Sequence, residues 1–389
     1  MGALHQLNSR SSEFDSIRGI AAFGVVWYHI RKTELFWYWT SMDLFFVLSS
    51  FLIGRLILRN INGWSDVSAF YLRRAVRLWP GYLITVVGIY AIQQLFVATG
   101  HGPQHSSDAL FRFLTFSQYT ELYYSPRELW DYPKFAIHLW TLGVEEQFYI
   151  LFPVAFLLLR HAGLWVTSGL FVLGILSGVL ARMQGLDFHL LAHHVDAFFL
   201  GSGLALGFAF VRRHERWFRM IFPALGLLGF GLALPYLIDG YQSYPGNVKE
   251  LNPLTPLYFS LLWTSMIGWV ALNSGSPGLG WLRHPLPVYL GRISYSLYLV
   301  HLPILALGSY FLRDALVHFF GLHIARELCA VASLPAVFLV AHGLYRWIDK
   351  PLQEAGAVAA LPQQPDRRPE SGTREPGSAP TRVPSSALG

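Results

Sequence analysis

The chain has 389 residues, of which 53% are hydrophobic and only 13% are charged. Ordinary soluble domains carry roughly a quarter charged residues, so this composition excludes a soluble globular enzyme and predicts a polytopic membrane protein. The single cysteine, Cys329, lies in an apolar run, which excludes a disulfide framework and a thiolate metal cluster. Any chemistry would therefore use histidine, carboxylate or hydroxyl groups, and we expect no metal site.

Apolar runs long enough to cross a bilayer as helices follow one another along most of the chain. Residues 1–13 are polar, and no apolar stretch with a small-residue cleavage site indicates a removable signal peptide. We therefore expect a short cytoplasmic segment followed by a membrane anchor. After residue 355 the chain is rich in Pro, Gly, Ser, Arg and Glu, which predicts a disordered cytoplasmic tail over 355–389. The sequence thus predicts an all-α bundle over 14–354 with about ten spans, at roughly 15–31, 35–58, 79–98, 135–159, 164–181, 193–211, 219–238, 254–272, 286–311 and 327–348.

Lys and Arg are distributed unevenly between the two sides of this bundle. If both termini share one side, that side holds the larger number of basic residues, so the positive-inside rule places both termini in the cytoplasm. The loops 99–134 and 239–253 then face outward and are rich in aromatic and polar residues. Such residues suit a sugar ligand, although belts of Tyr and Trp at the membrane interface are the simpler explanation.

The first apolar run carries two residues that are energetically unfavourable in a bilayer, Arg18 and His29. They are eleven positions apart, which on a helix is about 20° past three full turns with a rise of roughly 16 Å. They therefore share one helix face at two depths. An Arg and a His on one stripe of a membrane helix must face a protein interior or a wet cavity.

The second run holds Asp43. A carboxylate at that depth costs several kcal/mol unless it is paired, so it predicts a cationic or hydrogen-bonding partner nearby. In one interpretation Asp43 only fixes helix packing, through Arg18 or another cation. In the other it orients His29, because a carboxylate on one imidazole nitrogen sets the tautomer of the ring.

A cluster of arginines precedes the third run, in the segment FYLRRAVRLWPGY. Arg74 and Arg77 are three residues apart and share a helix face, while Arg73 points aside. The simple interpretation is an anchor that contacts lipid phosphates. The sharper one is a clamp for a phosphorylated cofactor, because Arg binds phosphate through a bidentate fork.

Two later runs also carry polar residues where lipid is expected. His138 and Glu145 are seven apart and share a face, whereas Glu145 and Glu146 diverge by about 100°. Adjacent carboxylates in an apolar run are difficult to explain by packing alone. Tyr298 and His301 share a face in the ninth run, where each alone would usually be a helix-to-helix hydrogen bond but together could line a cavity.

In order and spacing these segments resemble the acyltransferase 3 family of integral membrane O-acyltransferases, from about residue 14 to residue 351. Ser50, Met42 and Thr141 depart mildly from the family pattern, and none of these departures removes an ionisable group. The segments that carry the resemblance are FDSIRGIAAFGVVWYH, MDLFFVLSSFLI, FYLRRAVRLWPGY, HLWTLGVEEQFYILFPV, VDAFFLGSGLA, YLGRISYSLYLVHLPI and YRWIDKP.

The resemblance implies transfer of an acyl group, commonly acetyl from acetyl-CoA, to a hydroxyl of a carbohydrate or glycosylated molecule. It implies acyl-CoA as a co-substrate, no permanently bound cofactor, no nucleic acid partner, and a place in the bacterial cytoplasmic (inner) membrane. It points to His29 and Arg18 as the central pair, to Arg74 and Arg77 near the donor, and to Asp43, Glu145 and His301 as polar cavity residues. Together with the spacing arguments, this assigns His29, Arg18, Asp43 and Glu145 to catalysis, Arg74, Arg77 and Arg18 to the donor, and His138, Glu146, Tyr298 and His301 to the substrate cavity.

Two points stay open in the sequence. His29 could deprotonate the acceptor or be acylated itself, and Asp43 or Glu145 would hold its ring. The acceptor could be a surface polysaccharide, a lipopolysaccharide, a lipo-oligosaccharide or a macrolide sugar. A glycan transporter without acyl transfer is the competing class, because it too would place ionisable groups in a ten-span bundle.

Overall fold

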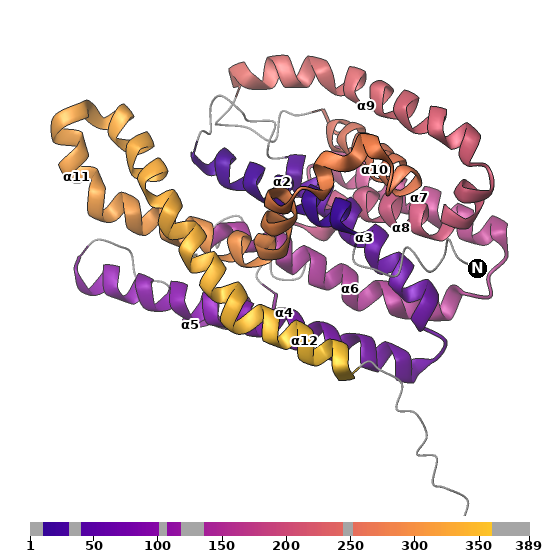
Figure 1. The fold of residues 1–389 in the computed structure, drawn as a ribbon, viewed down its shortest axis with the longest axis horizontal. Helices are drawn as coiled ribbons and strands as arrows, with labels where there is room; N and C mark the ends of the chain where they lie inside the picture. Colours follow the sequence, from indigo (N-terminus) through magenta and orange to yellow (C-terminus); the bar gives the residue numbers. More distant parts are fainter. Residues whose placement is uncertain (1–10, 31–39, 101–106, 118–135, 244–251, 360–389) are drawn as a thin grey trace, which may run out of the picture.

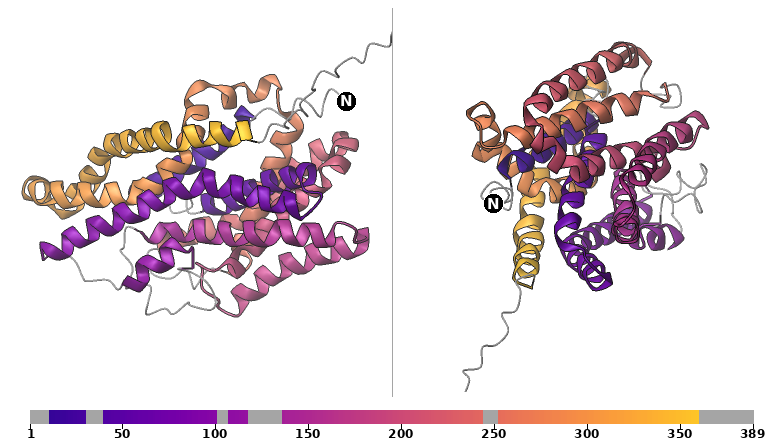
Figure 2. Two further views of the ribbon diagram at one scale, coloured as in Figure 1. Left: turned by 90° about the horizontal axis from the view of Figure 1, so that it is seen from below. Right: turned by 90° about the vertical axis from the view of Figure 1, so that its right-hand side faces the viewer.

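The computed structural model describes residues 11–30, 40–100, 107–117, 136–243 and 252–359. Within these ranges the regular structure is entirely helical (Figure 1). The longer helices run along one common direction (Figure 2). The elements are α2 (Ser12–Ile30), α3 (Ser41–Asn60), α4 (Trp64–Ala98), α5 (Ser107–Leu114), η4 (Ile137–Leu139), α6 (Trp140–Leu159), α7 (Leu164–Met183), α8 (Leu191–Arg213), α9 (Glu215–Ser243), α10 (Thr255–Asn273), η6 (Pro277–Arg283), α11 (Pro285–Leu344), η7 (Tyr345–Asp349) and α12 (Lys350–Ala359).

Every expected membrane span coincides with a helix. In the described part of the chain, nine helical segments are long and apolar enough to cross a bilayer. The expected first span, α2, has 19 residues and carries Glu13, Asp15 and Arg18, so its apolar content is lower than that of the other nine. The prediction of a polytopic helical bundle is confirmed, and the protein is an integral membrane protein.

The helices divide into a central and a peripheral set. The most apolar windows of α3 and α10 are each 61% buried, whereas those of α7 and α9 are only 22% buried. The side chains that α7 and α9 leave exposed include Leu164, Trp165, Leu227 and Leu228. Because lipid is as apolar as a protein core, this pattern places α7 and α9 against the bilayer and the polar residues of α2 and α3 inside the bundle.

Small residues let α2 and α11 approach to backbone contact. A Cβ added to Gly291 would lie 1.8 Å from the carbonyl oxygen of Asp15, and one added to Gly19 would lie 2.4 Å from the nitrogen of Gly291. Membrane helices use small residues at such contacts because packing rather than hydrophobicity drives their association. This contact brings Arg18 close to the α11 residues that follow Gly291.

Several boundaries differ from the expected ones. Helix α4 has 35 residues and begins at Trp64, so the arginine motif lies within the helix and not ahead of it. Helix α11 contains a break at Gly321, whose φ of 73° suits only glycine, and the chain turns back there (Figure 1).

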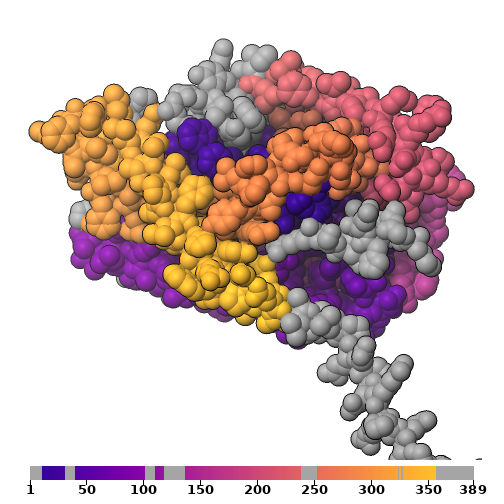
Figure 3. Space-filling view, in the orientation of Figure 1, coloured from indigo at the N-terminus to yellow at the C-terminus, as the bar shows by residue number. Residues whose placement is uncertain are grey.

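The end of the bundle also differs from the prediction. Helix α12 continues to Ala359, beyond the expected start of the tail, because it packs on α4 (Figure 3). The outward loops expected to suit a sugar fall largely outside the described residues. Residues 1–10 and 360–389 also lie outside them.

Candidate active site

A cavity of about 250 Å³ lies between α2, α3, α4, α6, α11 and α12. Its lining follows α3 from Met42 to Leu56, which is about 21 Å along a helix. Gln353 of α12 lines it as well. The cavity therefore extends along much of the length of α3.

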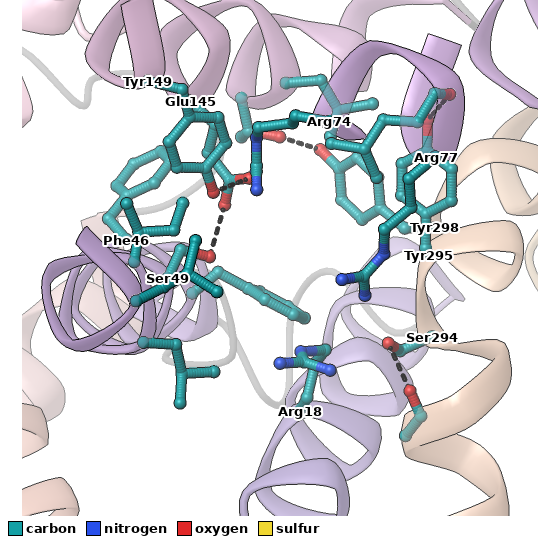
Figure 4. A pocket seen from close by; sticks show the side chains of 18 of the residues that line it. Arg18, Phe46, Ser49, Arg74, Arg77, Glu145, Tyr149, Ser294, Tyr295 and Tyr298 are labelled. Atoms are coloured by element: carbon teal, nitrogen blue, oxygen red, sulfur yellow. Dashed lines mark hydrogen bonds between the residues drawn. The ribbon is translucent and has the colours of Figure 1, made fainter. Parts of the chain in front are cut away.

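Three arginines from two helices line this cavity. Arg18 comes from α2, and Arg74 and Arg77 come from α4. Their guanidinium groups are directed into the same space (Figure 4). Arg73, next in sequence to Arg74, does not line the cavity. A fourth arginine, Arg292 of α11, also lines it, so the cavity has the charge of an anion-binding site.

Acidic and aromatic groups hold Arg74 in place. Its Cζ lies 3.2 Å from the centre of the Tyr149 ring, a cation–π contact, and its Nε lies 3.9 Å from Glu146 Oε1. Glu145 accepts hydrogen bonds from Tyr149 at 2.8 Å and from Ser49 at 3.1 Å. Glu145 also interacts electrostatically with Arg74 and Arg18. The carboxylates thus offset part of the positive charge and fix its geometry.

The end of the cavity near the start of α6 is lined by two hydroxyl side chains. The Tyr298 phenol donates to the carbonyl of His138, and the Thr141 hydroxyl lies 2.6 Å from the same phenol oxygen. A phenol has one proton, so Thr141 is the donor in this second bond. Both side chains are buried, and they form a wall between the cavity and a group of histidines.

Behind this wall three imidazoles meet from three elements. The ring of His301 lies 5.0 Å from that of His29 and 4.8 Å from that of His138, centre to centre. It also lies 5.5 Å from the Tyr298 ring. His301 and His138 are buried and His29 is half-buried. His29 is therefore linked to the cavity through His301 and Tyr298 and does not line it.

The expectation that Asp43 or Glu145 holds the ring of His29 is wrong. His29 Nδ1 lies 2.8 Å from the carbonyl oxygen of Val25, one helical turn earlier. A carbonyl only accepts, so Nδ1 carries the proton of the neutral ring and Nε2 has the lone pair. The local helix backbone therefore sets this tautomer.

The partner of Asp43 is His194 of α8, neither Arg18 nor His29. Their Oδ1 and Nδ1 atoms are 3.1 Å apart, and both residues are buried. His194 Nε2 lies 2.9 Å from the carbonyl of Phe188 and must donate there. Neutral His194 and ionised Asp43 would then face each other as two acceptors, so the pair has to share one further proton.

Next to this pair lies a buried ion pair between α7 and α8. Arg182 contacts Asp196 through two hydrogen bonds, of 3.0 and 2.8 Å. Arg182 also donates to the carbonyls of Pro253 and His193, each at 2.5 Å. Arg182 thus makes four hydrogen bonds to buried acceptors, as a charge within a membrane bundle requires. This network fixes α7, α8 and the start of α10.

The structure divides the predicted site residues into two groups. His138 lies in the 3₁₀-helix η4 ahead of α6, where its Nε2 contacts the carbonyl of Leu299. Glu146 contacts Arg74 from outside the lining. The cavity is lined by Arg18, Arg74, Arg77, Glu145 and Tyr298, whereas His29, Asp43, His138, Glu146 and His301 do not line it.

Sequence reasoning missed several residues of the site. Tyr149 lies four residues after Glu145 and shares its face, a spacing that could have identified it. His194 and Arg182 carry no comparable signal, because their contacts depend on the packing of α3, α7 and α8. Among the described residues, no group of three or more His, Cys, Asp or Glu side chains could hold a metal ion.

An arginine-lined cavity near buried imidazoles thus lies within a bundle of apolar helices, as in a membrane-embedded enzyme. The chain belongs to the acyltransferase domain family Acyl_transf_3, whose model matches residues 11–342.

Two curated relatives are similar along most of the chain. The Peptidoglycan O-acetyltransferase OatA of Listeria monocytogenes is 27% identical over 365 residues, covering 88% of this chain and 56% of that protein. The O-acetyltransferase OatA of Staphylococcus aureus is 27% identical over 384 residues, covering 90% of this chain and 58% of that protein. The chain thus spans a little over half the length of these relatives. No solved structure matches it significantly.

Proposed function

We propose that this protein is a membrane O-acyltransferase that moves an acyl group, acetyl in the first instance, from acyl-CoA to a hydroxyl of a carbohydrate. The single observation that carries this proposal is the convergence of Arg18, Arg74 and Arg77 on one cavity whose Tyr298 wall contacts His301, which in turn contacts His29. The printed names of the relatives, O-acetyltransferase and peptidoglycan O-acetyltransferase, support the acetyl group and the carbohydrate acceptor.

The cavity suits the donor in charge and in length. Arginine binds phosphate through a planar fork, so the three guanidinium groups would hold the phosphates of acyl-CoA. About 21 Å of lining along α3 leaves room for an extended arm. The thioester would then lie at the end lined by Tyr298 and Thr141, close to the histidines. His29 is about 16 Å beyond Arg18 on the same helix.

The reaction needs a base and a route to it. The acceptor hydroxyl gives its proton to His29 Nε2, the new C–O bond forms as the C–S bond of the thioester breaks, and the thiolate of CoA then takes that proton. Because Tyr298 and His301 lie between the cavity and His29, these side chains must shift for the thioester to reach an acceptor beside His29. Val25 holds the Nδ1 proton of His29, which leaves the Nε2 lone pair to act as a base or to be acylated.

The proposal includes an orientation and a location. With both termini in the cytoplasm, the end of the cavity at Leu56 and Gln353 opens on the cytoplasmic side, where acyl-CoA is made. The acceptor then approaches His29 from the other side. We assign the protein to the bacterial cytoplasmic membrane, where a surface polysaccharide, lipopolysaccharide or lipo-oligosaccharide precursor would be the acceptor.

Washed membranes test this proposal against the transporter alternative. Membranes that contain the protein and a glycan acceptor are incubated with acetyl-CoA labelled in the acetyl group, and the glycan is extracted. The proposed function predicts label in the glycan that mild base releases, as an ester requires. Glycan movement across the membrane without label incorporation would instead support a transporter. Mass spectrometry of surface glycans with and without the protein would then identify the acceptor.

A further inference from the structure

Arg74 and Arg182 both lie within the bundle, yet their surroundings hold them in opposite ways. Arg182 makes four hydrogen bonds, two of them to the carboxylate of Asp196. Among the described residues, the Nε of Arg74 has no hydrogen-bond partner, and Glu146 Oε1, 3.9 Å from that atom, is beyond hydrogen-bond distance. The guanidinium of Arg74 is directed into the cavity (Figure 4). Arg182 is therefore a structural cation, whereas Arg74 keeps donors for a ligand.

The ring of Tyr149 supports the guanidinium of Arg74 without using these donors. The Cζ of Arg74 lies 3.2 Å from the ring centre, and Tyr149 is buried. An N–H aimed at the ring would bring its nitrogen about 1.3 Å closer than Cζ, inside van der Waals contact, so the flat face of the guanidinium meets the ring. The N–H groups lie in the plane of the guanidinium. The cation–π contact thus orients the charge and leaves the fork free.

The hydroxyl of Tyr149 holds the nearest competitor for that fork, the carboxylate of Glu145. Glu145 lines the cavity and interacts electrostatically with Arg74. Its Oε2 accepts a hydrogen bond from the Tyr149 phenol at 2.8 Å, and its Oε1 accepts one from the Ser49 hydroxyl at 3.1 Å. Each carboxylate oxygen therefore has a donor other than Arg74. A carboxylate without these donors would pair with the arginine through its fork, as Asp196 pairs with Arg182.

We propose that Tyr149 is a positioning residue that keeps the guanidinium fork of Arg74 open for a phosphate of the acyl donor. Its ring supports the guanidinium, and its hydroxyl holds the Glu145 carboxylate away from it. This inference rests on the proposed function. The donor then meets an arginine that is already oriented and has no hydrogen bond to a carboxylate to break, so less free energy is lost in ordering the site on binding.

Two substitutions of Tyr149 separate the ring from the hydroxyl. Tyr149→Phe keeps the ring but frees Glu145 Oε2 to bond Arg74 in competition with the phosphate. A hydrogen bond between charged groups corresponds to about 10- to 100-fold in affinity, so the Kd for the donor should rise by at least about 10-fold. Tyr149→Leu also removes the cation–π contact, which corresponds to about 30-fold when it is shielded from water, so the Kd should rise further.

Double substitutions separate both roles from packing. In a Glu145→Gln background no carboxylate competes for the fork, so adding Tyr149→Phe should change the donor Kd by less than about threefold. In an Arg74→Ala background there is no guanidinium to support, so Tyr149→Leu should also add less than about threefold. A general loss of packing would instead raise the Kd by the same factor in every background.

Equilibrium binding of acetyl-CoA, labelled in the acetyl group, to the purified protein in nanodiscs provides the measurement. An excess of unlabelled CoA defines specific binding. Thermal unfolding in detergent checks the fold of each variant. If Tyr149→Leu unfolds, the effect of Tyr149→Phe with and without Glu145→Gln decides.

Tyr82 of α4 is the matched control. It is buried like Tyr149, its ring stacks on that of Phe116, and its hydroxyl donates to the carbonyl of Phe113 at 2.8 Å. It does not line the cavity. Tyr82→Phe and Tyr82→Leu should therefore keep the donor Kd within about twofold of wild type.

Three results would overturn the inference. A wild-type Kd in Tyr149→Phe means that the hydroxyl does not restrain Glu145. An equal effect of Tyr149→Phe with and without Glu145→Gln means that only packing matters, and a Kd in Tyr149→Leu no higher than in Tyr149→Phe means that the ring does not support Arg74. All three leave the proposed function intact, because the wild-type protein still binds acetyl-CoA and transfers label. Absence of donor binding and transfer by the wild-type protein refutes the proposed function itself and this inference with it.

Discussion

Replacing Arg74 tests whether the arginine-lined cavity binds the acyl donor. Its guanidinium lies 3.2 Å from the Tyr149 ring centre and 3.9 Å from Glu146, and it is directed into the cavity. A charge-assisted hydrogen bond is worth roughly 1.5–3 kcal/mol, so Arg74→Ala should raise the donor KM about 10- to 100-fold. The acceptor KM should change less than about twofold. Arg74→Lys keeps the charge without the fork and should fall between the two.

The adjacent Arg73 provides the matched control. It is on the same helix and carries the same charge, but it does not line the cavity. Arg73→Ala should therefore leave the donor KM within about twofold of wild type. The assay measures initial rates of label transfer from acetyl-CoA in membranes that contain equal amounts of each variant. Equal effects of Arg73→Ala and Arg74→Ala would show that the motif acts only as a membrane anchor, and the reasoning would be refuted.

Two further predictions concern the bundle that positions the site, and each compares unfolding midpoints in detergent. Gly291→Val should cost at least about 1–3 kcal/mol through overpacking and lower activity, whereas Gly278→Val, where a Cβ meets open space, should change little; equal midpoints would contradict the backbone contact. Asp196→Ala leaves Arg182 buried without its carboxylate and should cost about 3–5 kcal/mol. Glu215→Ala breaks a surface pair and should cost at most about 1 kcal/mol, so equal losses in the two variants would contradict the buried network.

The helical bundle could be predicted because membrane helices have a strong local signal. About 20 apolar residues are needed for each span, and each expected run has a helix. The ends of the helices were harder to predict, because hydropathy does not mark where an apolar helix continues past the bilayer. Helix α4 therefore begins at Trp64, earlier than the apolar run, and α12 extends into the predicted tail because its packing on α4 depends on tertiary structure.

The candidate site was predictable where residues act along one helix. The shared face of Arg74 and Arg77 follows from a spacing of three residues, and both line the cavity. The partners of Asp43 and His29 could not be predicted in this way. His194 reaches Asp43 from a helix about 150 positions later, and Val25 contacts His29 through its backbone, which every residue has.

The most direct test of the central claim is a single-turnover measurement on His29→Ala. The purified variant and wild type, each in nanodiscs, are loaded with labelled acetyl-CoA and then mixed with a glycan acceptor. We expect both to bind the donor with the same Kd, because the phosphates contact the arginines and not His29. Transfer should be slower in the variant by about 10²- to 10⁴-fold, the usual contribution of a general base. Transfer by His29→Ala at the wild-type rate would contradict the account.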